Sequence, residues 1–149
     1  MKYISRSIDK TLEEWKESTT HKPLLLRGAR QVGKSSAVRH LGTQFKYFAE
    51  VNFESAKSIA TFFKGDLDVK LISSKISNYI QVPIIPGQTL LFLDEIQACP
   101  EAIMALRFFK EDYPELHVIA AGSLLEFALQ SLPTFGVGRI HSVFMYPMT

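Results

Sequence analysis

Eight consecutive residues have the types and the spacing of a phosphate-binding loop. Residues 28–35 read Gly-Ala-Arg-Gln-Val-Gly-Lys-Ser, which fits the pattern G-x-x-x-x-G-K-[S/T] in full. The two glycines, Gly28 and Gly33, let the backbone fold so that several N–H groups point at one anion. An apolar run ends at Gly28 and a helical pattern follows Gly33, so the N-terminus of that helix would point at the same anion. We therefore predict a loop that binds nucleotide phosphates.

The residue types within this loop predict separate roles. The ammonium of Lys34 would reach the β- and γ-phosphates, and the hydroxyl of Ser35 would ligate Mg²⁺. An ordinary glycine turn beside a surface lysine and serine is the alternative, and the flanking strand and helix argue against it. Arg30 would project from the loop toward a phosphate or toward a partner. The predicted nucleotide contacts are Gly28, Ala29, Arg30, Gln31, Val32, Gly33, Lys34, Ser35 and Ser36.

Two carboxylates follow a second apolar run. Residues 90–93 are Leu-Leu-Phe-Leu, typical of a strand buried on both faces, and Asp94 and Glu95 come directly after them. Ligands of open α/β sheets bind at this end of the strands. Asp94 fits the Walker-B role, holding Mg²⁺ directly or through water, and Glu95 fits a general base that polarises the attacking water. Alone the pair could enter a solvated loop, but beside the phosphate loop the catalytic interpretation is the better one.

Two further side chains, Ser123 and Arg139, each admit two interpretations, and Arg107 admits a preferred one. Ser123 follows an apolar strand pattern and would sense the γ-phosphate or orient water, or would cap the helix expected at 124–130. Arg139 would act as an arginine finger toward a neighbouring subunit, or would be an ordinary surface arginine. For Arg107 the preferred interpretation is a surface pair with Glu111 at i+4.

Composition and charge limit the remaining classes. With 46% hydrophobic and 21% charged residues, the 149 residues fit a single folded domain over 1–149. The net charge of +2 neither indicates nor excludes nucleic acid. The single cysteine, Cys99, cannot form an internal disulfide, and no apolar run approaches the length of a membrane span. We expect a cytoplasmic protein.

Hydrophobic periodicity predicts the elements that position these residues. Apolar residues recur at helical spacing over about 5–19, which predicts an amphipathic N-terminal helix. Strands alternate with helices along the rest of the chain, which predicts an α/β fold with parallel pairing and right-handed crossovers. Strands are expected at 24–26, 47–53, 89–93, 117–121 and 139–145, and helices after 33, at 55–64, at 67–81, after 100 and at 124–130.

These motifs, in this order, resemble the bacterial and archaeal AAA-type P-loop ATPases in which an ATPase domain precedes a C-terminal domain of unknown function. The similar segments are residues 23–35, 93–97, 121–125, 136–139 and 145–147, so the similarity covers nearly the whole chain. The resemblance implies a three-layer P-loop NTPase fold, whose five-stranded parallel sheet of order 5-1-4-3-2 has helices on both faces. It also implies Mg·ATP as the ligand, Glu95 as the hydrolytic glutamate and Ser123 at the sensor-1 position.

The resemblance also sets an expectation about the end of the chain. Similar proteins continue past the last strand, whereas this chain stops at Thr149. We therefore expect the helical lid to be absent and the chain to be a fragment of a longer protein.

The functional prediction is Mg·ATP binding with ATP hydrolysis. One alternative is a nucleotide-gated binding module without turnover, and another is a P-loop small-molecule kinase. The adjacent carboxylates favour water activation over the kinase. An arginine finger requires a neighbour, so a homo-oligomer or a protein partner is expected. The N-K-x-D pattern of GTPases is absent, which favours ATP.

Overall fold

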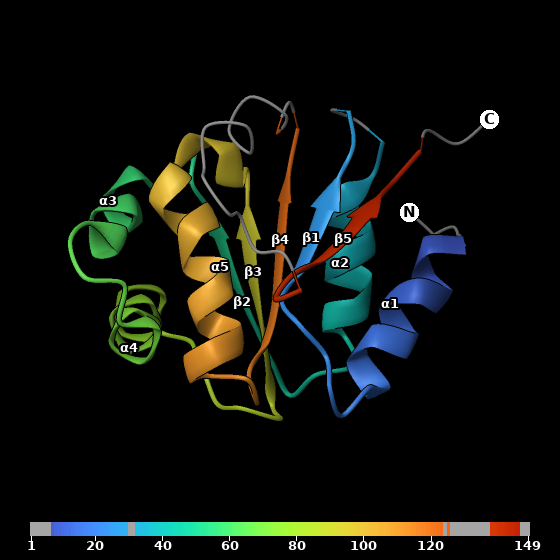
Figure 1. Cartoon of the computed structure of the whole chain (residues 1–149), viewed down its shortest axis with the longest axis horizontal. Coiled ribbons are helices and arrows are strands. Elements are labelled where there is room, and N and C mark those ends of the chain that lie inside the picture. Colours follow the sequence, from blue (N-terminus) through green and yellow to red (C-terminus); the bar gives the residue numbers. More distant parts are fainter. Residues whose placement is uncertain (1–6, 30–31, 124, 126–137, 147–149) are drawn as a thin grey trace.

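The computed structural model describes residues 7–29, 32–123, 125 and 138–146, and within them it contains one five-stranded sheet (Figure 1). All four strand pairs are parallel, in the order β2-β3-β4-β1-β5. Counted from the other edge this order is 5-1-4-3-2, so the predicted fold class and strand order are confirmed. The strands are β1 (Leu24–Arg27), β2 (Tyr47–Asn52), β3 (Thr89–Asp94), β4 (His117–Gly122) and β5 (His141–Phe144).

Helices cover both faces of this sheet. The helices α1 and α2 pack on one face, and α3, α4 and α5 pack on the other (Figure 1). Two of the connections include short 3-10 turns. The helical elements are α1 (Ser7–Glu17), α2 (Lys34–Gly42), α3 (Lys57–Ala60), η1 (Thr61–Phe63), α4 (Val69–Ile80), η2 (Ile96–Ala98) and α5 (Pro100–Asp112).

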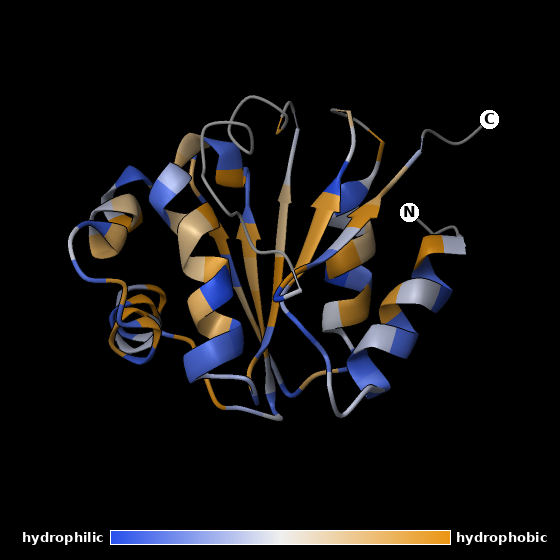
Figure 2. Ribbon diagram, viewed as in Figure 1, coloured by the Kyte–Doolittle hydropathy of each residue, from blue (hydrophilic) through white to orange (hydrophobic). Residues whose placement is uncertain are grey.

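The strands supply apolar side chains to both faces, which explains their unbroken hydrophobic runs. In β1, Leu25 packs with α3, α4 and α5, whereas its neighbours Leu24 and Leu26 pack with α1 and α2. In β3, Leu91 and Phe92 face opposite sides in the same way. Much of β1 and β3 is accordingly coloured at the hydrophobic end of the scale (Figure 2).

The predicted element boundaries differ from the structure in a few places. The stretch expected as one helix over 55–64 is a single α-turn, α3, followed by the 3-10 turn η1. The last strand is shorter than the expected 139–145, because only residues 141–144 pair with β1. The helix expected at 124–130 lies outside the described residues except for residue 125. None of the helices in the described part of the chain has the length and apolar character that a membrane span requires.

The parallel arrangement brings three strand ends to one edge of the sheet. The strands β1, β3 and β4 end at Arg27, Asp94 and Gly122, and β4 pairs with both of the others. The residues that follow these ends are Gly28, Glu95 and Ser123. The sheet therefore gathers the predicted site residues at its carboxyl edge.

Candidate functional site

The two glycines of the phosphate loop have backbone conformations that favour glycine. Gly28 has φ of 152°, and a Cβ there would lie 2.6 Å from the carbonyl oxygen of Met145. Gly33 has φ of 90° and precedes the first residue of α2. Both conformations are costly for residues with a side chain. Arg30 and Gln31, also predicted to contact the nucleotide, lie outside the described residues.

The ammonium of Lys34 lies within this loop. Its Nζ donates hydrogen bonds to the carbonyl oxygens of Gly28 at 2.8 Å and Ala29 at 2.7 Å. The residue is only 9% exposed. A phosphate group at the loop would compete with these carbonyl oxygens for the ammonium. A charged N–H donor inside such a loop is what a polyphosphate requires.

The hydroxyl of Ser35 and the carboxylate of Asp94 meet across the site. Ser35 Oγ, in the first turn of α2, donates to Asp94 Oδ2 at 2.8 Å. Asp94 is the last residue of β3 and is 4% exposed. These two residues are 59 positions apart in the sequence, so the fold brings them together.

This pair of oxygens fits a Mg²⁺ site. Within the described residues, no group of three or more His, Cys, Asp or Glu side chains could hold a metal ion. Mg²⁺ does not need such a cage, because it is commonly held by one or two protein oxygens together with substrate phosphates and water. Ser35 and Asp94 would supply those protein oxygens.

Glu95 has an unusual backbone conformation for a residue with a side chain. Its φ of 53° and ψ of 45° lie in the left-handed region, directly after β3 ends. Its N–H donates to Asp94 Oδ1 at 2.9 Å. Non-glycine residues in this region are uncommon and often occur at functional sites. This conformation turns the chain sharply, so the adjacent carboxylates of Asp94 and Glu95 lie in different environments.

Gln97 holds the carboxylate of Glu95, and this role was not predicted. Its Nε2 donates to Glu95 Oε2 at 2.7 Å. Its Oε1 lies 2.5 Å from the position of a Cβ added to Gly122, so any side chain at residue 122 would displace Gln97. The sequence feature that could have indicated this role is the position of Gln97, two residues after Glu95 in a motif that resembles AAA-type ATPases.

Ser123 is placed at the same edge, between the phosphate loop and the acidic pair. The residue is 3% exposed, and its Oγ has no hydrogen-bond partner among the described residues. A buried hydroxyl without a partner is costly unless a ligand or water satisfies it. The capping interpretation concerns the helix expected at 124–130, most of which lies outside the described residues.

Two ionisable side chains on the elements around the site, Arg39 and Cys99, have shifted pKa values. The hydrogen bond from Arg39 of α2 to Glu50 of β2 raises the pKa of the guanidinium, and the charge of Asp94 acts in the same direction. Burial raises the pKa of the Cys99 thiol. The arginine therefore stays cationic, and Cys99 stays a protonated thiol that packs in the core.

Comparison with known proteins identifies the family. A family model described as "AAA domain" matches residues 20–149. The chain belongs to the AAA domain family. The family and the fold that the sequence resemblance implied are thereby confirmed. A comparison with curated proteins found no match.

Two solved structures share the fold of this AAA domain. The Aeropyrum pernix ORC1 protein in complex with DNA matches with a TM-score of 0.60 and 16% identity, over 95% of this chain and 44% of that chain. C. elegans PCH-2 matches with a TM-score of 0.53 and 15% identity, over 95% of this chain and 42% of that chain. This chain therefore spans less than half the length of either solved chain.

Arg139 lies at the amino edge of the sheet of the AAA domain, opposite the carboxyl edge that carries the candidate site. It comes two residues before β5, whose first residue pairs with the first residue of β1. Its Nε contacts Glu111 Oε1 at 2.5 Å, and Arg107 lies 3.8 Å from the same carboxylate oxygen. The expected pair of Arg107 with Glu111 is therefore present. Arg139 is remote from the phosphate loop of its own chain, so a finger role would require a neighbouring subunit.

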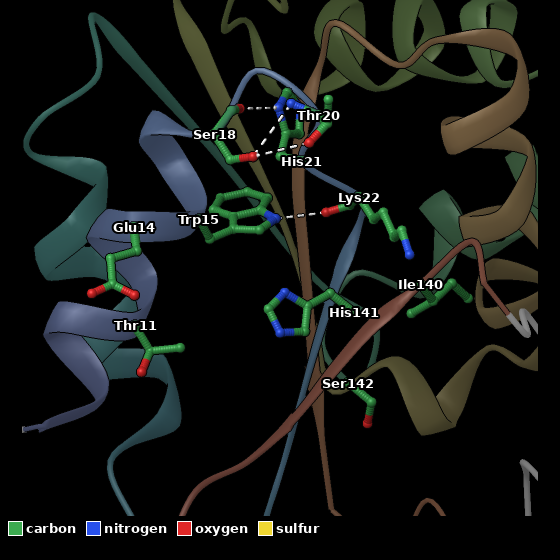
Figure 3. A pocket seen from close by; sticks show the side chains of 10 residues that line it. All are labelled: Thr11, Glu14, Trp15, Ser18, Thr20, His21, Lys22, Ile140, His141 and Ser142. Atoms are coloured by element: carbon green, nitrogen blue, oxygen red, sulfur yellow. Dashed lines mark hydrogen bonds between the residues drawn. The ribbon is translucent and has the colours of Figure 1, made fainter.

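A groove of about 470 Å³ lies between α1, the segment before β1, and the start of β5 (Figure 3). Its lining includes Trp15, His21 and His141. None of the predicted site residues lines it, and it belongs to the amino half of the sheet rather than to the carboxyl edge. The groove is therefore separate from the candidate nucleotide site of the AAA domain.

Proposed function

We propose that this AAA domain binds Mg·ATP at residues 28–36 and hydrolyses it with Glu95 as general base. The observation that carries the proposal is the 2.8 Å hydrogen bond from Ser35 Oγ to Asp94 Oδ2, with the Lys34 ammonium inside the adjacent loop. A cation-binding oxygen pair beside a phosphate-binding loop is the arrangement that nucleotide hydrolysis requires.

The binding part of the mechanism rests on backbone and charge. The N–H groups of the loop and of the first turn of α2 would donate to the phosphate oxygens, and Lys34 would neutralise the β- and γ-phosphates. Ser35 and Asp94 would hold Mg²⁺, which, when bound, stabilises negative charge that develops on the phosphate oxygens. Most of the catalysis then comes from positioning and charge stabilisation.

The hydrolytic part rests on Glu95 and Ser123. Glu95 would accept the proton of the attacking water, and the hydrogen bond from Gln97 would hold its carboxylate in one orientation. The unsatisfied hydroxyl of Ser123 would contact the γ-phosphate or orient the water. Arg139 would stabilise the transition state in a neighbouring subunit, so a homo-oligomer or a protein partner would complete the site. A buried free thiol and a need for ATP both fit the cytoplasm.

The test of this proposal is a pair of measurements on Glu95→Gln. The substitution keeps the size of the side chain and removes the base, so Mg·ATP affinity should stay the same while phosphate release falls by about 100-fold or more. Glu115→Gln, at an exposed carboxylate remote from the site, is the matched control and should change neither. Unchanged phosphate release by Glu95→Gln would contradict the role of Glu95.

The same measurements separate the proposal from a nucleotide-gated binding module. Such a module would bind Mg·ATP and release no phosphate even as the wild type at high protein concentration. Release that rises more steeply than protein concentration would support an active site completed by a neighbouring subunit.

A further inference from the structure

The arrangement of the strands gives the bound nucleotide a direction across the sheet. The groups proposed to act on the γ-phosphate, Asp94, Glu95 and Ser123, lie at the ends of β3 and β4. The phosphate loop follows β1, which lies between β4 and β5. A nucleotide with its γ-phosphate toward β3 and β4 and its other phosphates in the loop must extend its ribose and base toward β5.

The carboxyl end of β5 carries two exposed aromatic rings. Phe144 is 47% exposed and Tyr146 is 73% exposed. Their ring centroids lie 4.9 Å apart with planes tilted by 54°. Of the exposed large hydrophobic side chains in the described residues, only these two belong to β5 or to the segment after it.

Both rings are held close to the phosphate loop through the backbone. Phe144 pairs with Arg27, the residue before the loop. Met145, between the two aromatic residues, donates its N–H to the carbonyl oxygen of Arg27 at 2.7 Å. Its own carbonyl oxygen lies against Gly28, where a Cβ would approach it to 2.6 Å. The backbone that carries the two rings is therefore held next to the first residue of the loop.

We propose that Tyr146, flanked by Phe144, is the stacking surface for the purine base of the nucleotide. This inference rests on the proposed function, because it takes the phosphates to lie in the 28–36 loop. An exposed aromatic face stacks on any purine, since every base presents a π-face. The pair therefore contributes affinity for the base without selecting adenine over guanine.

Three Mg²⁺-supplemented ligands test this proposal: ATP, GTP and inorganic tripolyphosphate, each titrated into the wild type and variants of this chain. Tyr146→Ala should weaken ATP and GTP alike by about 5-fold or more, and should leave tripolyphosphate affinity unchanged. Tyr146→Phe should keep wild-type affinity for all three ligands. Tyr79→Ala removes an exposed aromatic ring on α4, away from the strand ends, and should change none of the three affinities.

Tripolyphosphate separates failure of this inference from failure of the proposed function. If Tyr146→Ala and Phe144→Ala both leave the ratio of ATP to tripolyphosphate affinity at the wild-type value, the stacking surface is wrong while the phosphate site stands. If Lys34→Ala leaves the affinity for all three ligands unchanged, the phosphate site itself is wrong and the stacking proposal falls with it. Retained tripolyphosphate binding also shows that each aromatic variant is folded.

Discussion

The side-chain amide of Gln97 donates a 2.7 Å hydrogen bond to Oε2 of Glu95, while its carbonyl oxygen packs against Gly122. Gln97 therefore connects the end of β3 with the end of β4, where Ser123 follows. The two strand ends each carry a residue of the proposed hydrolytic site. A side chain that touches both is placed to set the orientation of Glu95, the proposed general base.

Replacing Gln97 with Ala should slow hydrolysis without weakening nucleotide binding. The variant leaves Glu95 in place but frees its carboxylate to rotate, and misplaced catalytic groups cost on the order of 10- to 100-fold in rate. Steady-state kinetics should show a lower kcat with an unchanged KM. Gln88→Ala, at an exposed glutamine at the other end of β3, should behave as the wild type. A raised KM with unchanged kcat would contradict a positioning role.

Asp94→Asn and Ser35→Ala should both raise the Mg²⁺ concentration that ATP binding requires. Each removes one of the two protein oxygens that meet at 2.8 Å. The carboxylate carries the charge, so Asp94→Asn should raise the Mg²⁺ concentration needed for half-maximal binding by about 10-fold, and Ser35→Ala by less. Titration of Mg²⁺ at fixed ATP measures this, with Ser74→Ala on α4 as control. Equal Mg²⁺ titrations for all four proteins would exclude the site.

Gly28→Ala should destabilise the protein more than Gly65→Ala. Both glycines have positive φ, 152° and 81°, so both substitutions strain the backbone by about 1–2 kcal/mol. Only at Gly28 would the new Cβ also meet backbone, at 2.6 Å from the carbonyl oxygen of Met145, whereas nothing lies within 4 Å at Gly65. Urea unfolding measures the difference. Equal free energies of unfolding for the two variants would contradict the close approach of the loop to the segment after β5.

The fold should lose stability as the pH falls below about 6.5, in part through His117. Burial lowers the pKa of His117, and the charge of His21 lowers it further. The two imidazoles stack at 3.8 Å, and His117 Nε2 lies 3.0 Å from the carbonyl oxygen of Lys16.

The sign of this pH dependence follows from the direction of the shift. Because the folded pKa lies below the unfolded value of 6.5, the unfolded state binds more protons between the two values. His117 therefore leaves the free energy of unfolding unchanged above about pH 6.5 and lowers it as the pH falls toward the folded pKa. Urea unfolding between about pH 8 and about pH 5 should show a smaller decrease for His117→Asn than for the wild type. His40→Asn is the control, and an equal decrease in the wild type and His117→Asn would contradict the assignment.

Local patterns were enough to predict much of this fold. The apolar runs at Leu24–Leu26 and Thr89–Leu93 are continuous because their strands are buried on both faces. The phosphate loop and the acidic pair could be found directly, because each follows the end of one of these runs. The strand order itself came from the resemblance to a family. The helix expected over residues 55–64 is too long, because apolar spacing does not distinguish one α-turn followed by a 3-10 turn from a longer helix.

The sequence pattern could not predict contacts between residues that are far apart along the chain. The approach of Met145 to Gly28 joins residues more than a hundred positions apart, and it depends on the register between β1 and β5. The hydrogen bond of Gln97 to Glu95 is local, but it depends on the left-handed turn at Glu95, which residue types do not predict for a glutamate. Spacing identified the chemical groups, whereas the register and the turn determined how they are held.

Equilibrium binding of Mg·ATP to the wild type and to Lys34→Ala tests the central claim most directly. The ammonium lies inside the loop, with hydrogen bonds to Gly28 and Ala29, so its removal should weaken Mg·ATP binding by at least about 10-fold. Lys57→Ala, at an exposed lysine at the start of α3, should bind as the wild type does. Saturable binding that depends on Lys34 is the predicted result. Equal affinity of Lys34→Ala and the wild type, or no binding by the wild type, would contradict the proposed nucleotide site.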